Sequence, residues 1–235
     1  MDTITWFGHS AFKIDGGGAS VIIDPFLAPS TGLKPADLGK ADLVLVTHDH
    51  GDHVGCAIEY CRETQTPLGC VVGTAQALVE RGLPQNLTLS SMGFNIGGTV
   101  EVAGMKATMA QAFHSSDTAV PVSYIVTMPD GLRFYHAGDT GIFQSMELLA
   151  KLYPLDLALL PIGGFFTMDA FQAAHAAKML DAPNVIPMHW GTFPVLAQSP
   201  DEFFGYMKEI CPATQCLRMA PGQSVEMEHL KKRNQ

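Results

Sequence analysis

Histidine and aspartate side chains are concentrated in one short stretch, where His48, His50, Asp52 and His53 follow a run of apolar residues. In an extended segment residues i and i+2 point the same way, so the imidazoles of His48 and His50 can reach one ion. Gly51 permits a sharp turn that directs Asp52 and His53 toward a second position nearby. Neutral imidazole and carboxylate are good ligands for Zn, Mn and Fe, so this spacing predicts a metal site. The alternative is an exposed His-rich turn.

One loop cannot complete such a site, and three further candidate ligands follow other predicted strands: His114, Asp139 and His189. Each lies at or just beyond the carboxyl end of its strand, where α/β folds usually keep their functional sites. We therefore expect these three side chains to converge with the cluster at 48–53.

The elements that must position these side chains are short β-type runs, punctuated by glycine and proline. Strands are predicted at 3–7, 11–15, 19–24, 43–47, 69–73, 99–103, 105–114, 122–128, 132–137, 156–161, 184–187 and 224–227. Helices are predicted at 57–63, 74–81, 143–151, 169–180 and 200–210. Helices occur between strands in both halves, and neither a linker nor a repeat divides the chain. Residues 1–235 are therefore predicted to form one α/β domain, with strands packed between helices.

The chain is acidic, with 14 Lys and Arg against 23 Asp and Glu and a formal net charge of −9. It lacks the basic track that general nucleic-acid binding needs, so we expect no nucleic-acid partner. The hydrophobic share of 47% is ample for a core and excludes an intrinsically disordered chain. No secretory signal or membrane-length apolar run is evident, and the five cysteines form no disulfide framework. We therefore expect a cytoplasmic protein with no membrane partner.

The His-x-His-x-Asp-His segment at 48–53, followed in order by His114, Asp139 and His189, resembles the metallo-β-lactamase superfamily of metal-dependent hydrolases. The resemblance covers essentially the whole chain and implies a four-layer αββα sandwich. Within the superfamily, four segments are most similar to the branch of ascorbate-6-phosphate lactonase and its relatives: WFGHS at 6–10, GGFFTM at 163–168, PMHW at 187–190 and GTFP at 191–194. Members of that branch assemble as homo-oligomers, so the resemblance implies a homo-oligomer here.

The resemblance also implies two divalent ions, Zn, Mn or Fe, as cofactors. Seven side chains would hold them: His48, His50 and His114 on the first ion, Asp52, His53 and His189 on the second, and Asp139 bridging both. Asp24 matches the position of a family carboxylate that orients one of the ligand imidazoles.

Strand order alone also places Asp24 beside the cluster. If residues 8–10 form the first hairpin loop, the third strand returns and ends at Asp24, next to that loop. If strand 43–47 runs parallel to the third strand, His48 emerges on the same side, so His9, Asp24 and His48 share one rim. The alternative for Asp24 is an ordinary Asp-Pro turn. His9 could donate a proton to a leaving group or contact the substrate, or it could be a turn histidine bonded to backbone.

Two other histidines are expected to be structural. His136 precedes Asp139, which is the implied ligand in that segment, and His175 lies in an alanine-rich predicted helix that suits packing or an interface contact. Two interpretations stay open for four aromatic residues, the wall of an apolar pocket or the core: Phe165, Phe166, Trp190 and Phe193.

The predicted chemistry is hydrolysis by a hydroxide shared between two divalent ions about 3.5–4 Å apart. The hydroxide would attack an ester, lactone or phosphoryl centre. Asp52 would orient it and accept a proton, and His9 is the second candidate catalytic residue. The loaded cluster would carry a charge of about +1 inside an acidic chain, which favours a small anionic substrate.

Three functions remain to be distinguished. The leading one is a metal-dependent hydrolase of a small anionic ester or lactone. The second is a phosphodiesterase acting on a nucleotide or lipid headgroup, and the third is a non-catalytic metal-bound module for sensing or assembly. Structural metal sites are usually closed and four-coordinate, whereas this ligand set leaves room for water, which favours an enzyme.

Overall fold

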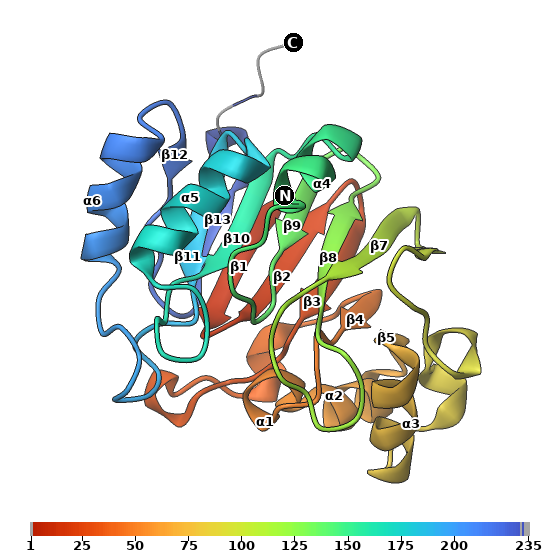
Figure 1. Ribbon diagram of the computed structural model, residues 1–235. Coiled ribbons are helices and arrows are strands. Elements are labelled where there is room, and N and C mark those ends of the chain that lie inside the picture. The colour runs from red at the N-terminus through yellow and green to blue at the C-terminus, as the bar shows by residue number, and fades with distance from the viewer. Residues whose placement is uncertain (1, 231, 233–235) are drawn as a thin grey trace.

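The computed structural model describes residues 2–230 and 232, which form two mixed β-sheets packed face to face (Figure 1). The first sheet has six strands in the spatial order β13 (Gln223–Glu226), β1 (Thr3–Gly8), β2 (Ala11–Gly16), β3 (Ala19–Ile23), β4 (Leu43–Leu45) and β5 (Leu68–Gly69). The second has seven strands in the order β12 (Gln215–Cys216), β11 (Asn184–Met188), β10 (Leu157–Pro161), β9 (Arg133–His136), β8 (Val122–Thr127), β7 (Met105–Gln111) and β6 (Thr99–Val102).

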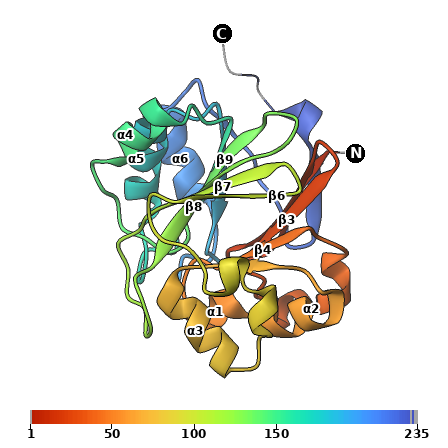
Figure 2. The same cartoon turned by 90° about the vertical axis from the view of Figure 1, so that its right-hand side faces the viewer.

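Helices cover both outer faces of this pair of sheets (Figure 2). The first sheet is covered by α1 (Gly51–Val54), α2 (Ala57–Thr64) and α3 (Val72–Glu80). The second is covered by α4 (Met146–Leu152), α5 (Ala170–Leu180) and α6 (Asp201–Ile210). The predicted four-layer αββα sandwich is therefore confirmed. Among the described residues, every helix is too short or too polar to cross a bilayer.

Strands β3 and β4 are buried on both faces because their side chains alternate between two apolar cores. Val21, Ile23 and Leu45 contribute to the core between the sheets, while Ile22 and Val44 contribute to a second core beneath α2 and α3. This double burial explains the continuous apolar runs in the sequence and fixes the two strands whose carboxyl ends lead into the candidate ligands.

The carboxyl ends of strands from both sheets meet at one edge of the sandwich. Strand β3 pairs with β4 in parallel, and β10 pairs in parallel with both β9 and β11. Two backbone hydrogen bonds join the sheets at this edge: Val122 N–H donates to the Thr47 carbonyl (3.0 Å) and His189 N–H to the His9 carbonyl (2.9 Å). The loops that carry the candidate ligands are therefore fastened across the sandwich by backbone as well as by side chains.

The structure differs from the predicted elements in several places, including strand β12 (Gln215–Cys216), which was not predicted. The predicted strand at 69–73 is wrong, because β5 ends at Gly69 and α3 begins at Val72, where tertiary packing overrides the β-preference of two adjacent valines. Strand β7 ends at Gln111, so His114 lies in the following loop rather than at the strand end. Residues 51–54 form the single turn α1, which carries Asp52 and His53.

The turn into Asp139 depends on Gly138, whose φ is 59° and whose backbone passes close to Thr47. A Cβ at this position would lie 2.9 Å from the Thr47 Cβ and from the Val122 carbonyl oxygen.

Gly138→Ala is therefore expected to lower the free energy of unfolding by about 2–4 kcal/mol, because the new side chain adds left-handed strain and overpacks the turn. Urea denaturation measures this change. Gly141→Ala is the matched control, because Gly141 has open space around it and an ordinary φ. Equal losses in the two variants would contradict this explanation.

Candidate metal centre

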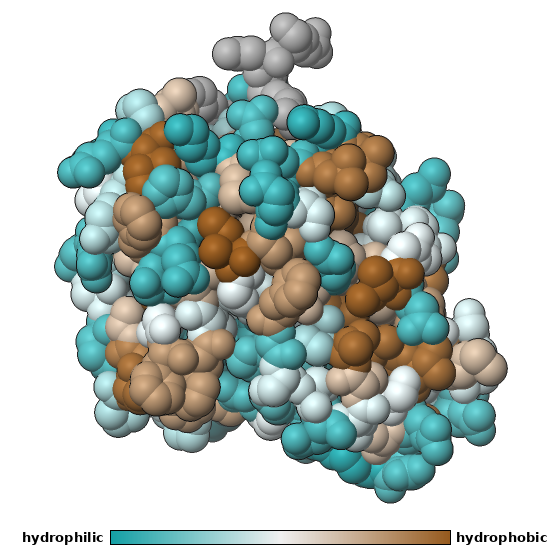
Figure 3. All heavy atoms as spheres, viewed as in Figure 1, coloured by the Kyte–Doolittle hydropathy of each residue, from teal (hydrophilic) through white to brown (hydrophobic). Residues whose placement is uncertain are grey.

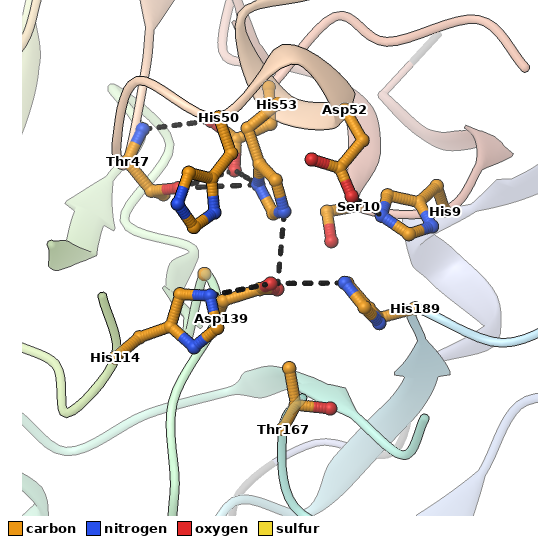
Figure 4. Close-up of polar contacts among 12 residues, drawn as sticks. His9, Ser10, Thr47, His50, Asp52, His53, His114, Asp139, Thr167 and His189 are labelled. Atoms are coloured by element: carbon orange, nitrogen blue, oxygen red, sulfur yellow. Dashed lines mark hydrogen bonds and ion pairs between the residues drawn. The ribbon is translucent and has the colours of Figure 1, made fainter. Parts of the chain in front are cut away.

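The predicted ligands converge from four segments at the edge where both sheets end, and Figure 4 labels all of them except His48. His48 and His50 follow β4, Asp52 and His53 lie on α1, and the remaining three follow β7, β9 and β11: His114, Asp139 and His189. Each loop leaves the carboxyl end of a buried strand, so the two packed sheets fix the starting point of every ligand-bearing segment.

The first group consists of His48, His50 and His114. One nitrogen from each ring can be chosen so that all three lie within 4.8 Å of one another. His48 Nε2 lies 2.9 Å from His50 Nδ1, and the His114 ring centre is 5.2 Å from those of both other rings. The alternation of side chains that the sequence predicted for His48 and His50 thus brings both imidazoles to one point.

The second group contains Asp52, His53 and His189, and it also includes His9. Ligand atoms of these four residues lie within 4.8 Å of one another. His53 and His189 are almost completely buried, whereas the Asp52 side chain is 26% exposed. Asp52 is therefore the member of this group that solvent or a substrate can reach most easily.

Asp139 lies between the two groups. Its Oδ2 is 3.0 Å from His189 Nε2 and 3.5 Å from His114 Nε2, and its Oδ1 is 3.2 Å from His53 Nε2. Burial alone would raise the pKa of Asp139, yet the His53 and His189 imidazoles hold that pKa well below its usual range. The carboxylate is thus ionised and faces imidazoles from both groups.

These residues fit divalent cations. Among the described residues, four buried ligand atoms in this cluster lack a hydrogen-bond partner: His53 Nε2, Asp139 Oδ1, and both ring nitrogens of His189. Buried polar atoms without partners are costly, and here they belong to neighbouring imidazole and carboxylate groups at a distance short enough to share an ion. Nitrogen and carboxylate oxygen donors of this kind suit Zn, Mn or Fe.

The comparisons with known proteins agree with this geometry. Residues 3–189 match a family model described as a β-lactamase superfamily domain. The chain belongs to the metallo-β-lactamase superfamily. Within the superfamily it belongs to the UPF0173 metal-dependent hydrolases: it is 57% identical to one from Nitratidesulfovibrio vulgaris over 96% of this chain and 95% of that relative. It is also 52% identical to one from Lawsonia intracellularis, over 96% of this chain and 99% of that relative.

A solved structure shows the same arrangement of the chain. Igni18, a metallo hydrolase from the hyperthermophilic archaeon Ignicoccus hospitalis, is 36% identical with a TM-score of 0.86, covering 95% of this chain and 97% of that one. The superfamily membership predicted from the sequence is thereby confirmed. The narrower resemblance to the ascorbate-6-phosphate lactonase branch stays a prediction.

Asp24 lies behind His53, on the side away from Asp139. Its fully buried carboxylate accepts hydrogen bonds from the Thr47 N–H (2.8 Å) and hydroxyl (2.7 Å), and its Oδ2 lies 2.7 Å from His53 Nδ1. An ionised carboxylate can only accept, so Nδ1 carries the proton and Nε2 is directed at Asp139. Burial would lower the pKa of His53, but Asp139 and Asp24 raise that pKa well above its usual value. A cation bound at His53 Nε2 would take the place of the proton there.

Backbone strain is concentrated in the same residues. His9, Asp24 and His189 have positive φ values of 51°, 48° and 59°, although none of them is glycine. Each lies just beyond a strand, and each such conformation costs on the order of 1–3 kcal/mol. The packing of both sheets maintains these conformations, which turn the three side chains into the cluster.

His9 has both ring nitrogens near polar partners. Its Nε2 lies 3.1 Å from Asp52 Oδ2 and its Nδ1 lies 3.0 Å from Thr192 Oγ1, while its ring centre is 3.9 Å from that of His189. Burial lowers the pKa of His9 to about 4. These contacts place His9 directly beside Asp52; its role as a proton donor stays a prediction.

The two histidines that were predicted to be structural lie outside the cluster. His136 is buried, with Nε2 2.9 Å from the Ser10 carbonyl oxygen, and its Nδ1 accepts a hydrogen bond from Gly138 N–H (3.1 Å). It therefore supports the turn into Asp139 without facing the cluster. His175 lies on α5 with its ring centre 4.6 Å from that of Phe171.

Asp49 is a functional residue that the sequence reasoning missed. It lies between two ligands in sequence but points away from them, and its largely buried carboxylate accepts hydrogen bonds from Ser116 Oγ (2.7 Å), Asp117 N–H (2.9 Å) and Thr118 Oγ1. These bonds tie the loop of His48 and His50 to the loop that carries His114. The only sequence signal for Asp49 was its position between His48 and His50. Because side chains alternate in an extended segment, Asp49 is expected to point away from the site of these two imidazoles.

Replacing Asp49 by alanine is expected to weaken metal binding by the His48, His50 and His114 group about 10–100-fold, because His114 loses its fixed position. Equilibrium dialysis with metal analysis measures this. Asp117→Ala is the matched control: it removes an exposed acidic side chain from the same loop but keeps the backbone N–H that Asp49 accepts. Unchanged metal affinity in Asp49→Ala, or an equal loss in both variants, would show that the tie is unimportant.

Proposed function

We propose that this chain hydrolyses a small anionic ester or lactone, using two divalent ions held by the cluster around Asp139. The observation that carries the proposal is the buried Asp139 carboxylate, 3.0–3.5 Å from imidazoles of both groups. One carboxylate between two sets of nitrogen donors is an arrangement that suits a dinuclear site. Membership of the UPF0173 metal-dependent hydrolases supports the same conclusion.

Each group of side chains has a defined task in this proposal. His48, His50 and His114 would hold the first ion and Asp52, His53 and His189 the second, with Asp139 shared. When bound, the two ions would lower the pKa of a water molecule and polarise the substrate oxygen. Asp24 keeps the proton of His53 on Nδ1, so that Nε2 is free to act as a ligand.

Asp52 is the side chain best placed to handle the proton of the attacking water. Its carboxylate is partly exposed and contacts His9. Burial would raise the pKa of Asp52, but the hydrogen bond from His9 and the nearby His53 hold that pKa below its usual range. An ionised Asp52 can orient the water and accept its proton as the water oxygen bonds to the carbonyl carbon; the acyl C–O bond then breaks and the proton passes to the leaving alkoxide.

The charge of the cluster favours an anionic substrate. Two divalent ions would bring four positive charges and the carboxylates of Asp24, Asp52 and Asp139 remove three, which leaves about +1 at the loaded cluster within a chain of net charge −9. A buried positive centre attracts a small anion at close range, whereas the acidic surface repels large polyanions.

The proposal is tested on protein stripped of metal and reloaded with Zn²⁺ or Mn²⁺. We expect hydrolysis of members of a lactone and carboxylic-ester panel, none without metal, and a decrease in kcat of about 10²–10⁴-fold in Asp52→Ala. His175→Ala is the matched control, since that histidine lies outside the cluster.

Other outcomes separate the alternatives. Faster cleavage of bis-p-nitrophenyl phosphate than of every ester and lactone would contradict the proposal in favour of a phosphodiesterase. Tightly bound metal without turnover of any ester class would favour a sensing or assembly module.

A further inference from the structure

Large apolar side chains gather on the loops that follow β3, β10 and β11; four of them are exposed and one, Phe26, is half-buried. We call this surface the apolar rim, and it consists of Phe26, Phe165, Phe166, Phe193 and Val195. Phe165 is 69% exposed, Phe166 55%, Val195 46% and Phe193 37%. Tan and brown side chains gather at the lower left of Figure 3, over the loops that follow β10 and β11. Contiguous exposed apolar surface of this kind usually marks a binding site.

The rim begins at the cluster itself. The rings of Phe26 and Phe193 each meet the His9 ring edge-on at 5.6 Å, and they lie 6.4 Å from each other. His9 in turn contacts Asp52 at 3.1 Å. Only one side chain therefore separates these two rings from the carboxylate that is proposed to activate water.

The loop of Phe165 and Phe166 is held firmly against the cluster. A Cβ at Gly163 would lie 2.6 Å from the His189 carbonyl oxygen, so the loop backbone packs directly on a ligand residue. Ala197 N–H donates to the Gly163 carbonyl (3.0 Å), which joins this loop to the loop of Phe193 and Val195. The exposed rings thus stand on backbone that is fixed in place beside the metal centre.

A surface pocket beside the rim is unsuited to an anion. Its lining includes the apolar side chains of Phe165, Val195 and Leu196, together with the acidic residues Asp169 and Glu202. The acidic residues repel a negative group, while the apolar side chains favour an uncharged one. A negative group is therefore favoured at the positive metal centre, and an uncharged group at this pocket.

We propose that the substrate carries an aryl or medium-length alkyl substituent, which lies across the apolar rim while the reacting carbonyl group lies at the cluster around Asp139. This rests on the proposed hydrolytic function and adds the substrate class: amphipathic esters or lactones with an apolar tail. Burying one such tail is expected to strengthen binding about 10–100-fold.

The test uses three carboxylates that cannot be hydrolysed: acetate, hexanoate and 4-phenylbutyrate. Their affinities for metal-loaded protein are measured by ligand-observed NMR titration, which needs no turnover. We expect 4-phenylbutyrate to bind about 10–100-fold more tightly than acetate, with hexanoate between them. Phe193→Ala and the double variant Phe165→Ala/Phe166→Ala should each reduce this ratio several-fold.

Phe171→Ala is the matched control, because Phe171 is 50% exposed but lies on α5 against His175 and Tyr206. It should leave the ratio of affinities unchanged. Circular dichroism verifies the fold of each variant. Because Phe165 and Phe166 are strongly exposed, the double variant is expected to disturb the fold less than Phe193→Ala does.

The possible results distinguish the two proposals. Equal affinities for the three carboxylates, or a ratio that the rim variants do not change, would overturn the apolar-tail proposal even if short esters are hydrolysed. Dissociation of an oligomer by the double variant, with an unchanged affinity ratio, would also overturn it and assign the rim to a contact between copies. A tail-dependent ratio in protein that hydrolyses no ester would support the rim as a binding surface while contradicting the hydrolase.

Discussion

The Asp139 carboxylate is buried within 3.5 Å of imidazole nitrogens from His53, His114 and His189, and the surrounding structure serves to keep it there. An isolated buried carboxylate is strongly unfavourable, so this position is stable only while positive charge faces it. In the absence of metal, protonated His53 between Asp139 and Asp24 can supply that charge. Divalent ions would supply more of it and would also satisfy His189 Nε2, which makes no hydrogen bond.

The same requirement explains why the cluster lies where the two sheets meet. Ligands after β4 and on α1 belong to the first sheet, whereas those after β7, β9 and β11 belong to the second. Backbone hydrogen bonds from Val122 to Thr47 and from His189 to His9 join the two sides. Neither sheet alone carries both groups of ligands, so the site forms only when the sandwich is packed.

Much of the site could be predicted because its ligands are polar residues at strand ends, where the rule for α/β folds applies. Strand order alone placed Asp24 near His48, and the structure brings it to His53 in the same cluster. Asp49 and Thr47 could not be found in this way, because their partners come from folded loops that periodicity does not describe. The strand predicted at 69–73 failed for the converse reason, since local β-preference there is overridden by packing. The exposure of Phe165 likewise depends on how two distant loops join.

The most direct measurement is anomalous diffraction from crystals of the zinc-loaded protein. The account predicts two zinc peaks, each about 2.0–2.3 Å from its ligand atoms. Their ligands would be His48, His50 and His114 for one peak, Asp52, His53 and His189 for the other, and Asp139 for both. A single peak, peaks away from Asp139, or these side chains separated from each other in protein that binds zinc in solution would contradict the account.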